Sequence, residues 1–275
     1  MAKIGERIKL PYLREVNAGS FLDGGELGEL LLPKGERLND EREMVEVFIY
    51  RDSENRPIAT QKIPIVMPGE FGVMTLLSSS NTGAFLDWGL AKDLLLPYSE
   101  QRNLPRIGQP VVAFVHVDEK SERLVASQRI GRHFSNEMPS YPVGAEVDIL
   151  LFGKTEMGYK VIVDNKYSGL LFANQVHEKL YYADKLKGYV TQVRHDWKID
   201  ISLYAPGNAK VEDLEARLEL ELESRGGFWD IDDKSPAETI NRELGVSKKV
   251  FKKATGALFK QRKIIFEDGG IRWIG

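Results

Sequence analysis

The chain has no cysteine among its 275 residues. This absence excludes disulfide bonds, thiolate metal sites and a cysteine nucleophile, and it is compatible with a reducing cytosol. No run of roughly eighteen apolar residues is present, and the opening MAKIGERIKL lacks an apolar stretch of signal-peptide length. We therefore expect a cytoplasmic protein without membrane contact.

Motifs that carry catalysis are also missing. The four histidines show no zinc-ligand spacing, and no glycine-rich loop with Lys-Ser or Lys-Thr is present. His195 precedes Asp196, but no serine nucleophile motif accompanies this pair. We predict that the chain is not an enzyme and holds neither a metal nor a cofactor. The net charge of −3 argues weakly against nucleic-acid binding over the whole surface, and the distribution of charge along the chain matters more.

One stretch of the sequence occurs twice. Residues 19–36 are GSFLDGGELGELLLPKGE and residues 83–100 are GAFLDWGLAKDLLLPYSE, with ten of eighteen positions identical. Such self-similarity indicates a duplicated structural unit. Around each copy, turn residues separate short apolar segments, which gives about five strands in roughly sixty residues. This is the size of a small β-barrel.

A third unit follows at lower similarity. Its strand-like segments begin near residue 146, and Asp164 falls at the position of Asp23 and Asp87. We predict three tandem five-stranded barrels at residues 1–62, 63–134 and 139–205, of which the first is degenerate.

The composition changes after residue 207. Leu214, Leu218 and Leu222 fall on one helical face. Ser235 and Pro236 indicate the start of another helix, with Ser235 as the N-cap and Pro236 at the first helical position.

The second predicted helix ends near Gly245. Ser247 is expected to cap the next helix over 248–263, and a strand, a glycine turn and a second strand follow. This order of elements is typical of a winged helix-turn-helix, which we place at residues 209–275.

The repeated motif resembles the RNA-binding domain of ribosomal protein S1. Residues 83–87 and 93–100 take the places of that family's glycine-to-acidic segment and its Gly-Leu-Val-His-x-Ser-Glu segment. The family's RNA-facing phenylalanine before the glycine is Ala18 in the first copy and Thr82 in the second. Phe21 and Phe85 match another family aromatic that can stack on a base, and the alternative is that both pack within the sheet.

The whole arrangement resembles the bacterial conserved virulence factor B family. Members carry three S1-like domains and a C-terminal winged helix, and they are regarded as RNA-binding regulators. The resemblance is strongest at residues 83–100 and 235–268. It implies a multidomain, mainly β fold: three tandem S1-like (OB-fold) five-stranded β-barrels followed by an α+β winged helix-turn-helix domain.

Basic residues gather in the last predicted helix. Residues 244–263 contain seven basic residues and no acidic one. Such a stripe can neutralise phosphates, and the alternative is a solvated helix face. The candidate nucleic-acid-binding residues here are Lys248, Lys249, Lys252, Lys253, Lys260 and Lys263.

The third barrel interleaves aromatic and basic residues. Rings can stack on bases while cations bind phosphates, although part of these rings must belong to the core. The candidates here are Tyr159, Lys160, Tyr167, Arg194, Trp197 and Lys198.

Together these patterns predict a non-catalytic protein that binds single-stranded RNA and regulates expression. The third barrel and the basic winged-helix face would form one RNA surface, with the first two barrels as spacers or protein contacts. Two alternatives stay open: a winged-helix regulator that binds DNA, and a module that binds ribosome or polymerase. The sequence leaves the oligomeric state open.

Overall fold

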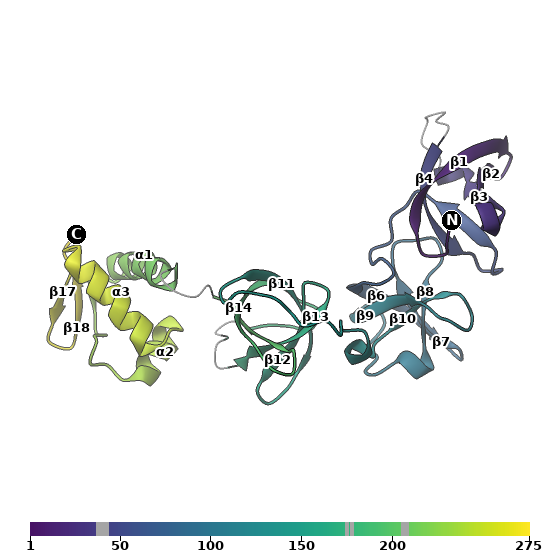
Figure 1. The fold of residues 1–275 in the computed structure, drawn as a ribbon. Coiled ribbons are helices and arrows are strands. Elements are labelled where there is room, and N and C mark those ends of the chain that lie inside the picture. The colour runs from purple at the N-terminus through teal and green to yellow at the C-terminus, as the bar shows by residue number, and fades with distance from the viewer. Residues whose placement is uncertain (37–43, 174–175, 177–178, 205–208) are drawn as a thin grey trace. The chain divides into compact units, whose positions relative to one another are not determined.

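The computed structural model describes residues 1–36, 44–173, 176, 179–204 and 209–275, with the backbone alone for 209–213. The chain forms two compact units. The first comprises Met1–Pro139, Asp148–Gly169 and Leu180–Leu186, and the second comprises Ser140–Val147, Leu170–Lys179 and Lys187–Gly275. Figure 1 follows the chain from the N-terminal barrel in purple to the C-terminal helices and hairpin in yellow.

Three closed five-stranded barrels with the same strand order confirm the predicted fold class. Each closes in the order first, second, third, fifth and fourth strand, the Greek-key connectivity of an OB-fold. The first barrel consists of β1 (Arg7–Val16), β2 (Gly19–Asp23), β3 (Glu29–Pro33), β4 (Met44–Arg51) and β5 (Pro57–Thr60). The second consists of β6 (Phe71–Ser80), β7 (Gly83–Asp87), β8 (Leu94–Pro97), β9 (Pro110–Val117) and β10 (Leu124–Ser127). The third consists of β11 (Glu146–Lys154), β12 (Gly158–Val163), β13 (Tyr167–Phe172), β14 (Lys185–Val193) and β15 (Ile199–Ser202).

Short 3₁₀ turns accompany the barrels. They are η1 (Gly25–Leu27), η2 (Lys34–Glu36), η3 (Tyr98–Glu100) and η4 (Ile130–Arg132).

The second strand of every barrel begins at a glycine. Gly19, Gly83 and Gly158 have φ values of 150°, 151° and 153°, a conformation that side chains rarely adopt. A Cβ at Gly19 would lie 2.0 Å from the carbonyl oxygen of Leu32 on the neighbouring strand. The close approach of backbones therefore explains this glycine in the repeated motif.

A bulge at one place in each barrel fixes which residues are equivalent. The register shifts beside the pairs Arg14–Phe21, Ser78–Phe85 and Gly153–Lys160. Such bulges re-aim side chains.

This register corrects the predicted place of Asp164. Counting from the bulge, the third-barrel residue equivalent to Asp23 and Asp87 is Ile162, because β12 continues to Val163. Asp23 and Asp87 each accept a hydrogen bond at 2.9 Å from the backbone N–H two residues on. Asp164 instead accepts one from the backbone N–H of Asp148 at 2.8 Å.

The first two barrels pack against each other through residues at which their repeats differ. Trp88 and Lys92 stand where the first copy has Gly24 and Gly28. The Trp88 ring is 2% exposed and lies edge-on to Phe48 of the first barrel, with centroids 5.9 Å apart. The residues that distinguish the second repeat from the first therefore form the contact between the two barrels.

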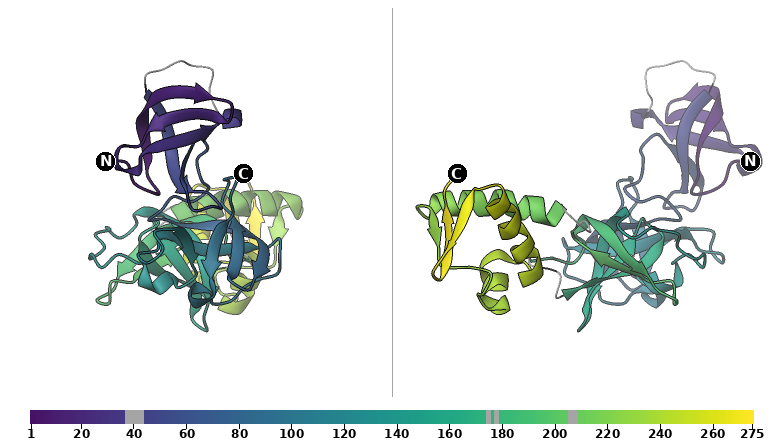
Figure 2. Two further views of the ribbon diagram at one scale, coloured as in Figure 1. Left: turned by 90° about the vertical axis from the view of Figure 1, so that its right-hand side faces the viewer. Right: turned by 60° about the vertical axis from the view of Figure 1, so that its left-hand side comes forward.

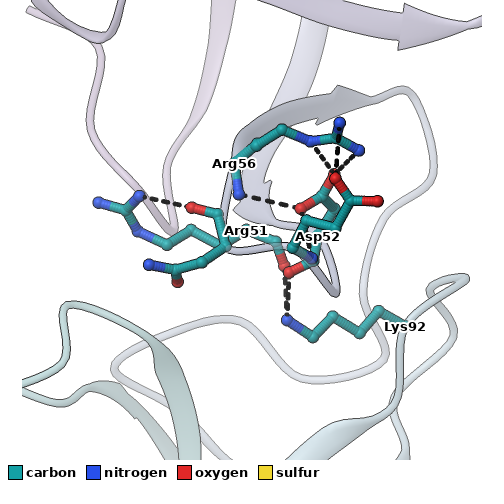
Figure 3. A network of polar contacts seen from close by, with 6 residues as sticks. Arg51, Asp52, Arg56 and Lys92 are labelled. Carbon is teal, nitrogen blue, oxygen red and sulfur yellow. Dashed lines mark hydrogen bonds and ion pairs between the residues drawn. The ribbon is translucent and has the colours of Figure 1, made fainter.

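A polar network closes this junction (Figure 3). The Lys92 ammonium donates hydrogen bonds to the carbonyl oxygens of Arg51 at 3.0 Å and Asp52 at 2.6 Å. Burial lowers the pKa of Lys92. The Asp52 carboxylate binds the Arg56 guanidinium at 2.8 Å and 2.9 Å, which holds the turn that presents these carbonyls.

Replacing Lys92 by alanine should lower the free energy of unfolding by about 1–2 kcal/mol, because two half-buried carbonyls lose their donor. Urea titration of the full chain measures this change. The exposed Lys120 of the same barrel supplies the control, since Lys120→Ala should have almost no effect. Equal effects of the two substitutions would contradict the role assigned to Lys92.

The C-terminal domain is the predicted winged helix. Its elements are α1 (Ala209–Ser224), β16 (Phe228–Trp229), α2 (Ala237–Leu244), α3 (Lys248–Lys260), β17 (Ile264–Glu267) and β18 (Gly270–Trp273). The sheet order is β16-β18-β17, and Figure 2 shows α1 and α3 beside this sheet. The core contains Leu214, Leu218, Leu222, Trp229, Ile231, Ile240, Leu244, Phe251, Ala254, Leu258, Ile264 and Ile271.

The caps of the two short helices agree with the sequence in part. Ser247 caps α3 as predicted, with its side chain accepting a hydrogen bond from Val250 N–H, and Gly245 ends α2 in the left-handed region at φ 68°. The predicted Ser235 cap is wrong by one residue, because Pro236 occupies the N-cap position. Ser235 instead binds the nearly buried Asp232 carboxylate at 3.0 Å.

Within the described residues, no helix is long and apolar enough to cross a membrane. The same residues contain no cluster of three or more His, Asp or Glu side chains arranged to hold a metal ion.

Candidate nucleic-acid interface

The outer face of α3 carries three cations without ion-pair partners among the residues that the structure describes. Lys249, Lys253 and Lys260 are exposed, while Phe251, Ala254 and Leu258 on the opposite face are buried. The amphipathic pattern therefore orients this helix: its apolar side completes the domain core and its basic side meets solvent.

The other predicted lysines of this region have protein partners. Lys248 Nζ donates to the carbonyl oxygens of Lys234 at 3.2 Å and Ser235 at 2.8 Å. Lys263 Nζ binds the Glu219 carboxylate of α1 at 2.6 Å. Both lysines thus help to hold the domain together.

Lys252 lies between these two groups, because it has a partner but only in an exposed ion pair. Its Nζ lies 3.5 Å from an Asp233 carboxylate oxygen, and both side chains are more than two-fifths exposed. Exposed pairs of this kind contribute little, so this lysine can exchange its partner for a phosphate.

A hairpin at the edge of the third barrel presents an exposed tryptophan. Trp197 is 46% exposed and has a φ of 63°. The backbone N–H of Arg194 donates to the carbonyl of Lys198 at 2.9 Å, which leaves a three-residue loop that ends in Trp197. Loops of this length place their last residue in the left-handed region, where glycine is favoured. A large aromatic ring here is unfavourable for the backbone.

The charges of this hairpin are paired with one another. The Arg194 guanidinium lies 2.7 Å from Asp200, and its centre is 5.6 Å from the Phe172 ring centroid. Lys198 Nζ lies 2.6 Å from Asp196, and this hydrogen bond holds the pKa of the Asp196 carboxyl below its usual value. The hairpin therefore presents a ring with little net charge.

Three further candidates from the third barrel lie in the other compact unit. Tyr159 is half-buried, with Lys154 Nζ 5.4 Å from its ring centroid, and Tyr167 has Lys166 Nζ at 5.3 Å. Lys160 is exposed and occupies the position that Phe21 and Phe85 hold in the other barrels. The third barrel thus has a cation where the first two barrels have a phenylalanine.

The two matched phenylalanines differ in their surroundings. The Arg14 guanidinium covers the Phe21 ring at 4.7 Å, and it is held there by two hydrogen bonds of 2.5 Å to Glu29. Phe85 is half-buried and pairs in register with Ser78 and Leu95. Both rings are half-buried, and only the Phe21 ring has a cation contact among the described residues.

Two exposed rings near the end of α3 were not predicted as site residues. Phe259 is 50% exposed and Phe266 on β17 is 40% exposed, with centroids 5.6 Å apart. The sequence did contain a signal, because Phe259 falls outside the apolar face formed by Ala254 and Leu258.

The comparisons with known proteins agree with this architecture. Residues 216–272 match the family model of the CvfB-like winged helix domain. Residues 4–62 match the S1 domain model, which confirms the S1 resemblance for the first barrel. S1 and winged-helix domains are nucleic-acid-binding modules, which supports nucleic acid as a partner.

Relatives of similar length match most of the chain. The uncharacterized protein YitL of Bacillus subtilis is 27% identical over 96% of this chain and 92% of its own length. Conserved virulence factor B of Staphylococcus aureus (strain bovine RF122 / ET3-1) is 25% identical over 93% of this chain and 89% of its own. A crystal structure of a multidomain protein with nucleic acid binding domains from Streptococcus pneumoniae covers 98% of both chains, with 22% identity and a TM-score of 0.44.

Proposed function

We propose that this protein is a non-catalytic RNA-binding regulator of expression that binds single-stranded RNA. The observation that carries the proposal is Trp197, a half-exposed ring held in a backbone conformation that favours glycine. Bases stack on such rings whatever their sequence, and single strands offer them unpaired.

The RNA phosphates would be bound on the winged helix. Lys249, Lys253 and Lys260 supply charge that the paired hairpin of the third barrel lacks. A chain with two such sites binds a longer strand more tightly than either site alone, because the second contact becomes intramolecular. The first two barrels would then act as spacers or as protein contacts.

A duplex-DNA regulator is the second candidate, and the unpaired cations on α3 favour it. A helix in this position of a helix-turn-helix can enter a major groove. The turn between β17 and β18 opposes this mode only in part: the exposed Asp268 repels phosphates, whereas Glu267 is paired with Arg272 at 2.7 Å.

Fluorescence anisotropy titrations separate these candidates. Purified full-length protein is titrated at two salt concentrations with a single-stranded RNA pool and with a duplex DNA of equal length. We expect tighter, salt-sensitive binding to the RNA. Preference for the duplex would make this protein a DNA regulator, and absence of binding to either would leave a role in contacting ribosome or polymerase.

A further inference from the structure

The exposed ring pair of the winged helix lies outside a core that is already complete. Phe251 and Leu258 on the inner face of α3 are fully buried. Phe259 and Phe266 do not belong to that core, and their rings lie 5.6 Å apart at 46° with half of Phe259 open to solvent. The pair is therefore available to a ligand.

Two cations follow Phe259 in the sequence, while the charge of Glu267, which follows Phe266, is offset by Arg272 at 2.7 Å. Lys260 directly follows Phe259 on α3, and Arg262 lies two residues further on. Both are exposed, and neither side chain forms an ion pair with any residue in the described part of the chain. Rings beside unpaired cations suit a base and its flanking phosphates.

A glycine lies one turn before the ring pair, inside α3. Glycine is less stable than alanine in a helix interior, and a Cβ at Gly256 would meet nothing within 4 Å. Packing within the chain therefore gives no reason for it. A ligand backbone that approaches the helix closely would give one.

The residue after the C-cap of α3, Arg262, is also an unusual choice. Arg262 has a φ of 58°, and the N–H of Lys263 donates to the carbonyl of Leu258 at 3.0 Å across the helix end. Glycine is the common residue at this left-handed position. A long cationic side chain thus occupies a position, three residues after Phe259, at which glycine is the common residue. Several such departures at one place indicate a functional site.

We propose that Phe259 and Phe266 form a stacking platform for an unpaired RNA base, with the flanking phosphates bound by Lys260 and Arg262 and the strand passing over Gly256. This inference rests on the proposed RNA binding and assigns single-strand recognition to the winged helix as well as to the third barrel. A base within a duplex has no free face for such a platform.

The test compares full-length protein with the double variant Phe259→Leu/Phe266→Leu, which keeps apolar volume and removes both rings. Each protein is titrated with a short uridine oligomer and with an abasic oligomer that has the same number of phosphates. The ratio of the two affinities should fall at least about fivefold in the variant, because one stacked base is lost. The salt dependence of binding should stay unchanged, because no phosphate contact is removed.

A second variant should change stability and RNA affinity in opposite directions. Gly256→Ala should raise the Tm by a few degrees and weaken binding to the uridine oligomer. If the wild type binds RNA and the double variant keeps the full affinity ratio, the platform is absent and the ring pair serves another partner, such as a protein. If the wild type binds neither oligomer, the RNA-binding function fails as well, so the two failures are distinguishable.

Discussion

Replacing Lys249, Lys253 and Lys260 together by glutamate should lower affinity for single-stranded RNA on the order of 100-fold at ~0.1 M salt. Each phosphate contact to a single strand contributes about 0.7 to the slope of log affinity against log salt. Three lost contacts therefore remove about two decades between ~0.1 M and ~1 M salt, and the measured slope should decrease in magnitude by about 2.

The fold should tolerate these three changes. All three side chains are exposed. A glutamate at Lys249 lies near the N-terminus of α3, where the helix dipole favours it, and one at Lys260 lies near the C-terminus, where the dipole opposes it. The two effects offset each other, so thermal unfolding should change little.

A matched control reverses three lysines outside the proposed surface. Lys3, Lys9 and Lys120 of the first two barrels are also exposed. Their replacement by glutamate changes the net charge equally and should reduce affinity much less. Equal losses of RNA affinity in both variants would show that RNA is attracted by the overall charge of the protein alone. An unchanged RNA affinity in the α3 variant would show that this helix face does not contact RNA.

Replacing Trp197 by alanine or by glycine should weaken RNA binding to a similar extent in both variants. Loss of one stacked base corresponds to about 1–3 kcal/mol, or roughly 5- to 150-fold in affinity. The salt slope should remain that of the wild type, because Trp197 carries no charge.

The two Trp197 variants should differ in stability. At a φ of 63°, glycine avoids the steric penalty of a side chain in the left-handed region, which is about 1–2 kcal/mol. The glycine variant should therefore be more stable than the alanine variant by about 1 kcal/mol in urea titrations. Tyr98, an exposed ring on the second barrel, supplies the control, since Tyr98→Ala should leave RNA affinity unchanged. Unchanged affinity in both Trp197 variants would remove the third barrel from the RNA surface.

The barrels could be predicted because the duplicated sequences keep the residues that the barrel fold requires. The glycines at 19 and 83 start a strand where backbones nearly touch, and the repeated apolar run supplies the buried side of the next strand. The place of Asp164 was not predictable in this way. β12 continues to Val163, past the equivalent position Ile162, and the length of a strand depends on its partners in the sheet.

The candidate site was predictable by region and less so by residue. The density of basic residues correctly predicted that α3 is an exposed basic helix. It could not distinguish Lys253, which is unpaired among the described residues, from Lys263, because the partner of Lys263, Glu219, is distant in sequence. The left-handed conformation of Trp197 likewise depends on the strands that flank its loop. Both properties arise from tertiary structure.

The most direct test is to crosslink a single-stranded RNA containing 4-thiouridine to the wild-type protein and to map the modified peptides by mass spectrometry. Our account predicts crosslinks in the hairpin of residues 194–198 and along α3 to Phe266, in one and the same chain. Crosslinks confined to the first two barrels, around Phe21 or Phe85, would contradict it.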